Sequence, residues 1–296
     1  MTRARAIAVG VSILMMMAAH VFASDMPPSE IIAKVNATYE SMQTYRADGT
    51  VVVEISERAK VERSFSILLK KPNLYLISWT QKDTPSWGGT VWSDGSQPYL
   101  YMAKEYFKMG SDISALATAA GVSLRSTYIT PSLFLPAFKQ EPTALSMIQD
   151  PKLEKQEQVG GEDCYVLSGV TEGLGKETFW ISKSKYLIVK NDFIVDHPAG
   201  GLPIVKRTDA QIDEDIQQMG EKPTDENRKK FREMMEAVNN HIKKTPAMKG
   251  TFLTTYVNIS SPDLRKEDFQ FVPPKGTVMK DSMLNAISGE MKWGRK

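Results

Sequence analysis

The chain has 296 residues, with 37 Lys and Arg against 35 Asp and Glu. This near balance of charge argues against nucleic acid as the principal partner, because such binding rests on Lys and Arg neutralising phosphates. The single cysteine, Cys164, excludes an internal disulfide, so the fold must be held by its apolar core.

The N-terminus has the pattern of a cleaved export signal. Arg3 and Arg5 precede an uncharged apolar run, Ala6–Ala19, that is too short to span a bilayer as a stable helix. Val21-Phe22-Ala23 then presents the small residues that a signal peptidase reads. We predict that residues 1–23 are a signal peptide and that the protein is exported to the periplasm; an uncleaved anchor helix is the alternative.

The next segment changes from a helical to a strand period. Ser29 is a plausible N-cap, and apolar residues at helical spacing predict an amphipathic helix from Ser29 to about Gln43. Alternation then predicts an antiparallel meander with strands at Val51–Ile55, Phe65–Leu69, Leu74–Thr80, Thr90–Ser93 and Pro98–Ala103. Several of these strands are apolar on both faces, as expected of a curved sheet with one face in the core and the other covered or lining a cavity.

Short helices are predicted to interrupt the strands. Ser111 caps a first helix that ends at Gly121, and brief helices follow at Pro131–Phe138 and around Thr143–Met147. Strands resume at Leu153–Val159, Cys164–Val170, Glu177–Ser182 and Tyr186–Val195, with a hairpin turn at Gly160-Gly161.

Residues 197–248 read as an inserted helical segment in a single domain that spans residues 24–296. Its one strong helix begins after Thr224 and ends near Lys244, with an apolar stripe through Phe231, Met234 and Val238. The last predicted strands are Gly250–Ser260 and Phe269–Val272.

The residues of common catalytic and metal sites are scarce. His197 and His241 are the histidines that follow the predicted signal peptide, and neither has a partner at the spacing of a metal site or a catalytic triad. We therefore predict no catalytic residues, no metal and no cofactor. The chain does carry 16 Met, 11 Phe, 10 Tyr and 5 Trp, which suit an adaptable apolar cavity. An ordinary packed core is the alternative use of the same residues.

Several short sequence motifs follow one another along the chain in the order typical of one family. They are Tyr39 to Gly49, Lys71-Pro72-Asn73, Val91 to Gly95, Tyr99-Leu100-Tyr101, Gly161 to Leu167, Phe179 to Ser182, Tyr186-Leu187 and Asp268 to Pro274. In this order the chain resembles the LolA/LolB/RseB-like superfamily of periplasmic proteins, especially its branch of uncharacterised predicted periplasmic proteins. The resemblance spans the chain after the signal except for about residues 197–248.

The resemblance implies a mainly β (α+β) fold: a strongly curved antiparallel sheet forming an unclosed β-barrel, with short helices plugging its concave face. It also implies a non-enzymatic binding protein for a lipid, a lipoprotein acyl chain or another long hydrophobic ligand, with transport of that ligand, as by a carrier, as one form of this role. We predict that the apolar lining is Val51, Val53, Ile55, Phe65, Ile67, Leu69, Tyr99, Tyr101, Leu116, Leu133, Phe134, Phe179 and Ile181. The alternative is an envelope signalling or interaction module of the same fold, with a protein partner on helix 224–244. That helix is also a candidate for transient contact with a membrane surface.

Overall fold

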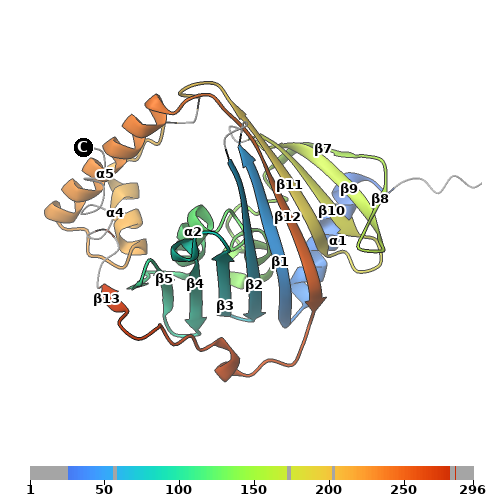
Figure 1. Ribbon diagram of the computed structural model, residues 1–296, viewed down its shortest axis with the longest axis horizontal. Coiled ribbons are helices and arrows are strands. Elements are labelled where there is room, and N and C mark those ends of the chain that lie inside the picture. Colours follow the sequence, from blue (N-terminus) through green and yellow to red (C-terminus); the bar gives the residue numbers. More distant parts are fainter. Residues whose placement is uncertain (1–25, 56–58, 172–174, 202–203, 281–283, 285–296) are drawn as a thin grey trace, which may run out of the picture.

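The computed structural model describes residues 26–55, 59–171, 175–201, 204–280 and Leu284. The predicted signal peptide, residues 1–23, lies outside this part of the chain. One large curved sheet dominates the molecule, with short helices behind one face and a helical hairpin at one side (Figure 1).

The sheet is built from two meanders and a strand that joins them. The first meander comprises β1 (Thr44–Ile55), β2 (Ala59–Lys70), β3 (Leu74–Gln81), β4 (Gly89–Asp94), β5 (Pro98–Met102) and β6 (Glu105–Lys108). The second comprises β7 (Ile148–Leu153), β8 (Glu157–Val159), β9 (Glu162–Thr171), β10 (Gly175–Ser182) and β11 (Ile188–His197). β12 (Met248–Ser260) pairs antiparallel with both β1 and β11 and so unites the two halves of the chain.

The described strands form one thirteen-stranded sheet in the order β13-β6-β5-β4-β3-β2-β1-β12-β11-β10-β9-β7, with β8 beside β9. Its neighbours are antiparallel except that β13 (Val278–Lys280) runs parallel to β6. The two edges, β13 and β7, are not paired with each other among these strands. The predicted curved and unclosed antiparallel sheet is therefore confirmed.

One face of the sheet is covered by helices and the other is more open. In β1, Tyr45, Val51 and Val53 are buried while Arg46 and Glu54 are exposed, because successive side chains point to opposite faces. The covering elements are α1 (Pro28–Ser41), α2 (Asp112–Val122), α3 (Ile129–Phe134) and the 3-10 turn η2 (Pro136–Phe138). Together with the covered sheet face they form the main apolar core.

The helix termini differ in detail from the sequence prediction. α1 begins with Pro27 at the N-cap and Pro28 at the first turn, so the predicted cap at Ser29 is wrong; proline suits this position because its fixed φ matches the helix. α2 is capped by Ser111, whose hydroxyl accepts from the Ser114 amide at 3.1 Å, as predicted. It continues through Gly121 to Val122. The segment predicted as a brief helix at 143–147 is only a turn.

The segment between β11 and β12 folds as a helical hairpin. α5 (Asp225–Lys244) is capped by Thr224 as predicted, whereas α4 (Asp209–Gln218) was not predicted. Thr208 and Gln211 form a capping box at the start of α4. Ile212, Ile216, Phe231 and Met234 of the hairpin form a small core together with Leu284, which follows β13.

The hairpin touches the edge of the sheet at a glycine. The Gly110 amide, which follows β6, donates to the carbonyl oxygen of Gln218 at 2.9 Å. A Cβ at Gly110 would lie only 2.2 Å from the carbonyl oxygen of Gln217, so this close approach requires glycine. The hairpin therefore extends from the β11–β12 end of the sheet to the β6 edge (Figure 1).

The C-terminal segment runs past the ends of the strands (Figure 1), and its Phe271 packs against Trp92 and Tyr101. The predicted strand at 269–272 is wrong: the chain instead forms the 3-10 turn η3 (Lys266–Phe269), with Phe269 buried, and returns to the sheet only at β13. η3 contacts β3 and β4. Alternation failed here because Phe269 is buried without pairing in the sheet, and the half-buried Phe271 packs on the rings of Trp92 and Tyr101.

Candidate functional site: the core beneath the helical cover

Most of the predicted lining residues meet in one cluster beneath the helices. Nine are buried there: Val51, Val53, Phe65, Ile67, Leu69, Leu116, Phe134, Phe179 and Ile181. Ile55 and Leu133 are partly buried and pack against the same cluster. These residues come from β1, β2, β10, α2 and α3, so the fold gathers them from distant parts of the sequence.

Tyr99 and Tyr101 lie on the other face of the sheet. Leu100 between them is buried in the main core, so strand alternation turns both tyrosines away from it. Tyr99 stacks on Trp92 with ring centroids 5.1 Å apart, and Tyr101 lies 5.4 Å from the ring of Phe271 in the C-terminal segment. This second aromatic cluster packs against Phe271 of the C-terminal segment rather than against α2 and α3.

The helix α2 covers large apolar sheet residues with small side chains of its own. Its sequence, DISALATAAGV, contains four alanines, and Ala115, Leu116 and Ala119 are its fully buried apolar residues. It packs on β4 and β5. Because an alanine buries little area, the apolar free energy that holds α2 to the sheet is small for a helix of three turns.

Polar contacts fix the two ends of α2 to the sheet. At its start, the buried Tyr75 hydroxyl of β3 donates to the Asp112 carboxylate at 3.0 Å. At its end, the Arg63 guanidinium of β2 donates to the carbonyl oxygen of Val122. Arg63 is only 3% exposed and also donates from Nε to Gln81 at 3.0 Å. α2 is therefore clamped to the sheet at its first and last residues.

Burial shifts the pKa values of these clamping groups. The pKa of Asp112 is raised, chiefly because burial disfavours the carboxylate, although the Tyr75 hydrogen bond opposes the shift. The pKa of Arg63 is lowered for the same reason, the loss of solvation. Neither charged group is solvated as it would be at the surface. Its hydrogen bonds to protein partners therefore replace those that water would make.

A buried polar network lies under the segment that joins α2 to α3. Glu177 of β10 is fully buried and pairs with Arg125 Nη2 at 3.0 Å. The Asn191 amide donates to the same carboxylate at 3.1 Å, and the Thr171 hydroxyl does so at 3.3 Å. Burial raises the pKa of Glu177, while Arg125 and these hydrogen bonds oppose the shift. The network places a neutral ion pair inside an apolar core.

Three tyrosine hydroxyls lie within the same core. Tyr39 on α1, Tyr45 on β1 and Tyr256 on β12 are all buried. Burial raises the pKa of Tyr39 to about 12 and raises those of Tyr45 and Tyr256 as well. Thr130 of α3 stands beside all three hydroxyls and lowers each pKa in part. The core therefore has a polar centre within its apolar walls.

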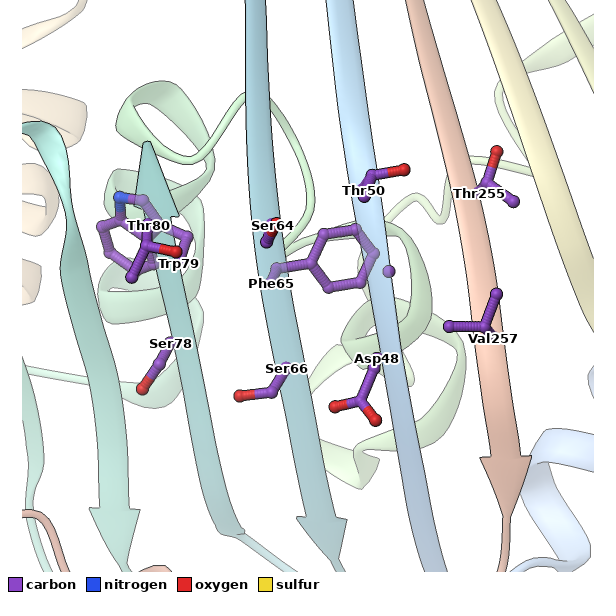
Figure 2. A pocket seen from close by; sticks show the side chains of 11 residues that line it. Asp48, Thr50, Ser64, Phe65, Ser66, Ser78, Trp79, Thr80, Thr255 and Val257 are labelled. Atoms are coloured by element: carbon purple, nitrogen blue, oxygen red, sulfur yellow. The ribbon is translucent and has the colours of Figure 1, made fainter. Parts of the chain in front are cut away.

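The open face carries a separate shallow groove of about 430 Å³ (Figure 2). Small polar side chains from four neighbouring strands line it in two rows that follow the strand register. One row is Thr255, Thr50, Ser64 and Thr80, and the other is Val257, Asp48, Ser66 and Ser78. Asp48 is the only titratable residue of this lining, and its carboxylate accepts from Asn258 at 3.1 Å. The groove therefore presents hydroxyl groups and a single carboxylate to solvent.

The polar residues of the covered face escaped the sequence prediction, although a signal for two of them was present. Arg63 alternates with Phe65 and Ile67 in β2, and Glu177 alternates with Phe179 and Ile181 in β10. The period of two alone assigns them to the apolar face. Arg125 offers no such signal because it lies between helices.

The described residues contain no group of three or more His, Cys, Asp or Glu side chains that could hold a metal ion. Across the same residues, no helix combines the length and the apolarity needed to cross a membrane.

No protein-family model and no curated protein matches this sequence. Solved structures do. The neighbours include LolA superfamily proteins. One such protein, from Nitrosomonas europaea, is 12% identical, with a TM-score of 0.34, covering 83% of this chain and 98% of that one. A conserved protein from Thermus thermophilus is 11% identical with a TM-score of 0.43, covering 86% and 98%. The lipoprotein LppX of Mycobacterium tuberculosis is 11% identical with a TM-score of 0.40, covering 81% and 99%. The superfamily is the one that the sequence phrases resemble.

Proposed function

We propose that this protein is a non-enzymatic binding protein of the periplasm that holds a long apolar ligand, such as a lipid or a lipoprotein acyl chain, beneath α2 and α3. We call these two helices the cover. The observation that carries the proposal is the way α2 is attached: alanines lie over a strongly apolar sheet face, with one polar contact at each end.

The magnitudes favour exchange of the cover for a ligand. Each CH₂ taken from water contributes about 0.8 kcal/mol, so a chain of some sixteen carbons represents on the order of 12 kcal/mol. Breaking the two end contacts of α2 costs about 1 to 3 kcal/mol each. A bound acyl chain can therefore offset the release of α2, while the closed form protects the apolar face when no ligand is present.

The proposal is tested by purifying the full chain from the periplasm of an expressing bacterium and analysing it by native mass spectrometry and lipid extraction. Co-purifying acyl species are expected. A protein that carries none, and that also fails to bind the apolar dye N-phenylnaphthylamine, contradicts the proposal.

A groove-filling variant distinguishes the two candidate regions. Thr50→Trp fills the open-face groove without touching the covered face, since Thr50 and its neighbour Val51 point to opposite faces. Dye binding is expected to persist in this variant. Loss of binding would move the site to the open face.

A protein-contact function is the second candidate, and the α4–α5 hairpin favours it. The hairpin has its own small core, and surface ion pairs tie its helices together, for example Arg228 to Asp213 at 2.7 Å. Such an element can present a partner surface without disturbing the sheet. Purification of a ligand-free protein with a bound protein partner would support this function over a lipid carrier.

A further inference from the structure

The α4–α5 hairpin buries its apolar residues against a third segment of the chain. Ile212 and Ile216 of α4 meet Phe231 and Met234 of α5 in one buried cluster. The same cluster contains Leu284, whose side chain is 0% exposed. Leu284 follows β13 and is separated from α5 in the chain by β12 and the C-terminal segment. A distant residue therefore completes the core between the two helices.

Ion pairs hold the two helices to each other without the help of Leu284. Arg228 Nε lies 2.7 Å from a carboxylate oxygen of Asp213, and Arg232 Nη2 lies 2.8 Å from one of Asp209. Each pair joins α5 to α4. Partly exposed pairs add little stability, but these two keep α4 beside α5. The apolar residues of the two helices would therefore still lie side by side if Leu284 withdrew.

The attachment of the chain just before Leu284 is weak. β13 pairs with β6 through three residues and runs parallel to it, which is the less stable kind of pairing. Val278 and Met279 are 52% and 45% exposed. Lys280 forms an ion pair with Glu105 at 3.2 Å, but both side chains are partly exposed, so the pair contributes little. This strand can therefore open locally while the rest of the sheet stays paired.

The C-terminal segment is held more firmly before β13. Phe269 is 0% exposed, and the ring of Phe271 lies 4.9 Å from that of Trp92 and 5.4 Å from that of Tyr101 between centroids. These contacts keep the segment near the hairpin even when β13 opens. A tethered group acts at a high effective concentration. Leu284 can therefore leave the hairpin and return to it, and it competes with any other molecule for the same place.

The space that Leu284 fills suits one kind of partner. Two helices side by side leave a groove that accepts the apolar face of a third helix. An extended peptide would instead need the unpaired backbone groups of a sheet edge, which helices do not offer. Leu284 itself has a helical backbone conformation. Met234 lines the groove, with Met219 and Met235 packed against the cluster, and methionine adapts to different apolar side chains.

We infer that the groove between α4 and α5 is a binding site for a leucine-bearing amphipathic helix of a partner protein, and that Leu284 occupies this site as an internal competitor. Binding of the partner displaces Leu284 and releases β13 from β6. The groove is separate from the core beneath the cover. The inference rests on the protein-contact function, the second candidate, to which it adds a surface and a kind of partner, and it is independent of lipid binding.

A fluorescein-labelled peptide of residues 278–292 of this chain tests the groove by fluorescence anisotropy with the full-length protein. Leu284→Asp should vacate the groove, because a carboxylate is costly to bury among apolar side chains. We expect this variant to bind the peptide at least about tenfold more tightly than the wild type, in which Leu284 competes. The same peptide carrying Leu284→Asp should bind neither protein.

Two outcomes of this titration overturn the inference: equal binding of the peptide to wild type and variant, or binding to neither. Both leave the lipid-binding function untouched. A protein that co-purifies with the wild type and stays bound in excess peptide would also overturn the inference, because protein contact would then use another surface. That result would still support the protein-contact function.

Hydrogen exchange of the hairpin provides the second test. Leu284→Asp should speed exchange in α4 and α5 about 10-fold to 150-fold, the change expected for the loss of one buried leucine, and the unlabelled peptide should reverse it. Val272→Asp is the matched control: Val272 belongs to the same segment but is 84% exposed, so exchange and peptide affinity should stay as in the wild type. Should Leu284→Asp fail to fold, Leu284→Ala is expected to show the same changes to a smaller extent. Unchanged hairpin exchange in the folded variants refutes the role of Leu284.

Discussion

Replacing Arg63 by methionine should loosen α2 without disturbing the sheet. Methionine keeps much of the unbranched apolar stem of arginine but removes the guanidinium that donates to the carbonyl oxygen of Val122 and to Gln81. A hydrogen bond to a charged group contributes about 1.5 to 3 kcal/mol. The equilibrium for release of α2 should therefore rise about 10-fold to 150-fold, at 1.4 kcal/mol for each factor of ten.

Hydrogen exchange followed by mass spectrometry measures this release directly. Peptides that cover 112–122 should exchange faster in Arg63→Met by roughly that factor, while peptides of the β1–β12 pair keep the protection of the whole sheet. The apparent affinity for N-phenylnaphthylamine should rise at the same time, because less free energy is spent in reaching the open form.

The matched control is Arg46→Met. Arg46 lies on β1, but its side chain is exposed and points away from the cover. Exchange in α2 should be the same in this variant as in the wild type. The reasoning is refuted if Arg63→Met lowers the protection from exchange equally in all peptides. Arg63 would then support the fold as a whole rather than the attachment of α2.

Three further results are expected. Gly110→Ala should detach the hairpin from the sheet edge and speed exchange in α4, because the new Cβ would meet a hairpin carbonyl at 2.2 Å; Gly121→Ala, with nothing within 4 Å, should leave exchange in α4 unchanged. Phe179→Ala should cost about 3 to 5 kcal/mol in denaturant unfolding, whereas the 84% exposed Val272 should tolerate alanine with less than about 0.5 kcal/mol of change. Asp112 has a raised pKa, so the native state holds its proton more tightly than the unfolded state and stability falls as pH rises from the unfolded value through the raised one. Asp112→Asn should reduce this decline in urea titrations at successive pH values, and an unchanged decline would assign it to other groups.

Local patterns in the sequence were sufficient for most of the architecture. The period of two in β1 and β2 and the cap at Ser111 act within a few residues, so they can be recognised without the fold. The predictions that failed have several causes: the cap of α1 lies at Pro27 rather than Ser29, the segment at 143–147 forms only a turn, and the burial of Phe269 comes from a distant surface. The segment around Phe269 alternates like a strand but contacts β3 and β4 as a 3-10 turn.

The predicted lining shows the same division. Val51 and Phe65 are buried in the covered core, on the face that alternation within apolar strands indicates; that they line a ligand site remains a prediction. Tyr99 and Tyr101 are apolar enough for either face, and only the register of β5 against β4 assigns them to the open one. Alternation divides the side chains of a strand into two sets on opposite faces. It does not predict which of the two faces the helices will cover.

The sequence by itself indicated most of the strands, the helices α1, α2 and α5 and the mainly β class, because hydrophobic periodicity and capping are local properties; it did not show β6 or β13, and it joined β7 and β8 into one strand at Leu153–Val159. The tertiary structure alone decided the attachment of α2 at Arg63 and Tyr75, and the buried pairing of Glu177 with Arg125 and Asn191. These contacts join residues far apart in the chain, and pairing across a curved sheet depends on register and twist, which composition and periodicity do not encode.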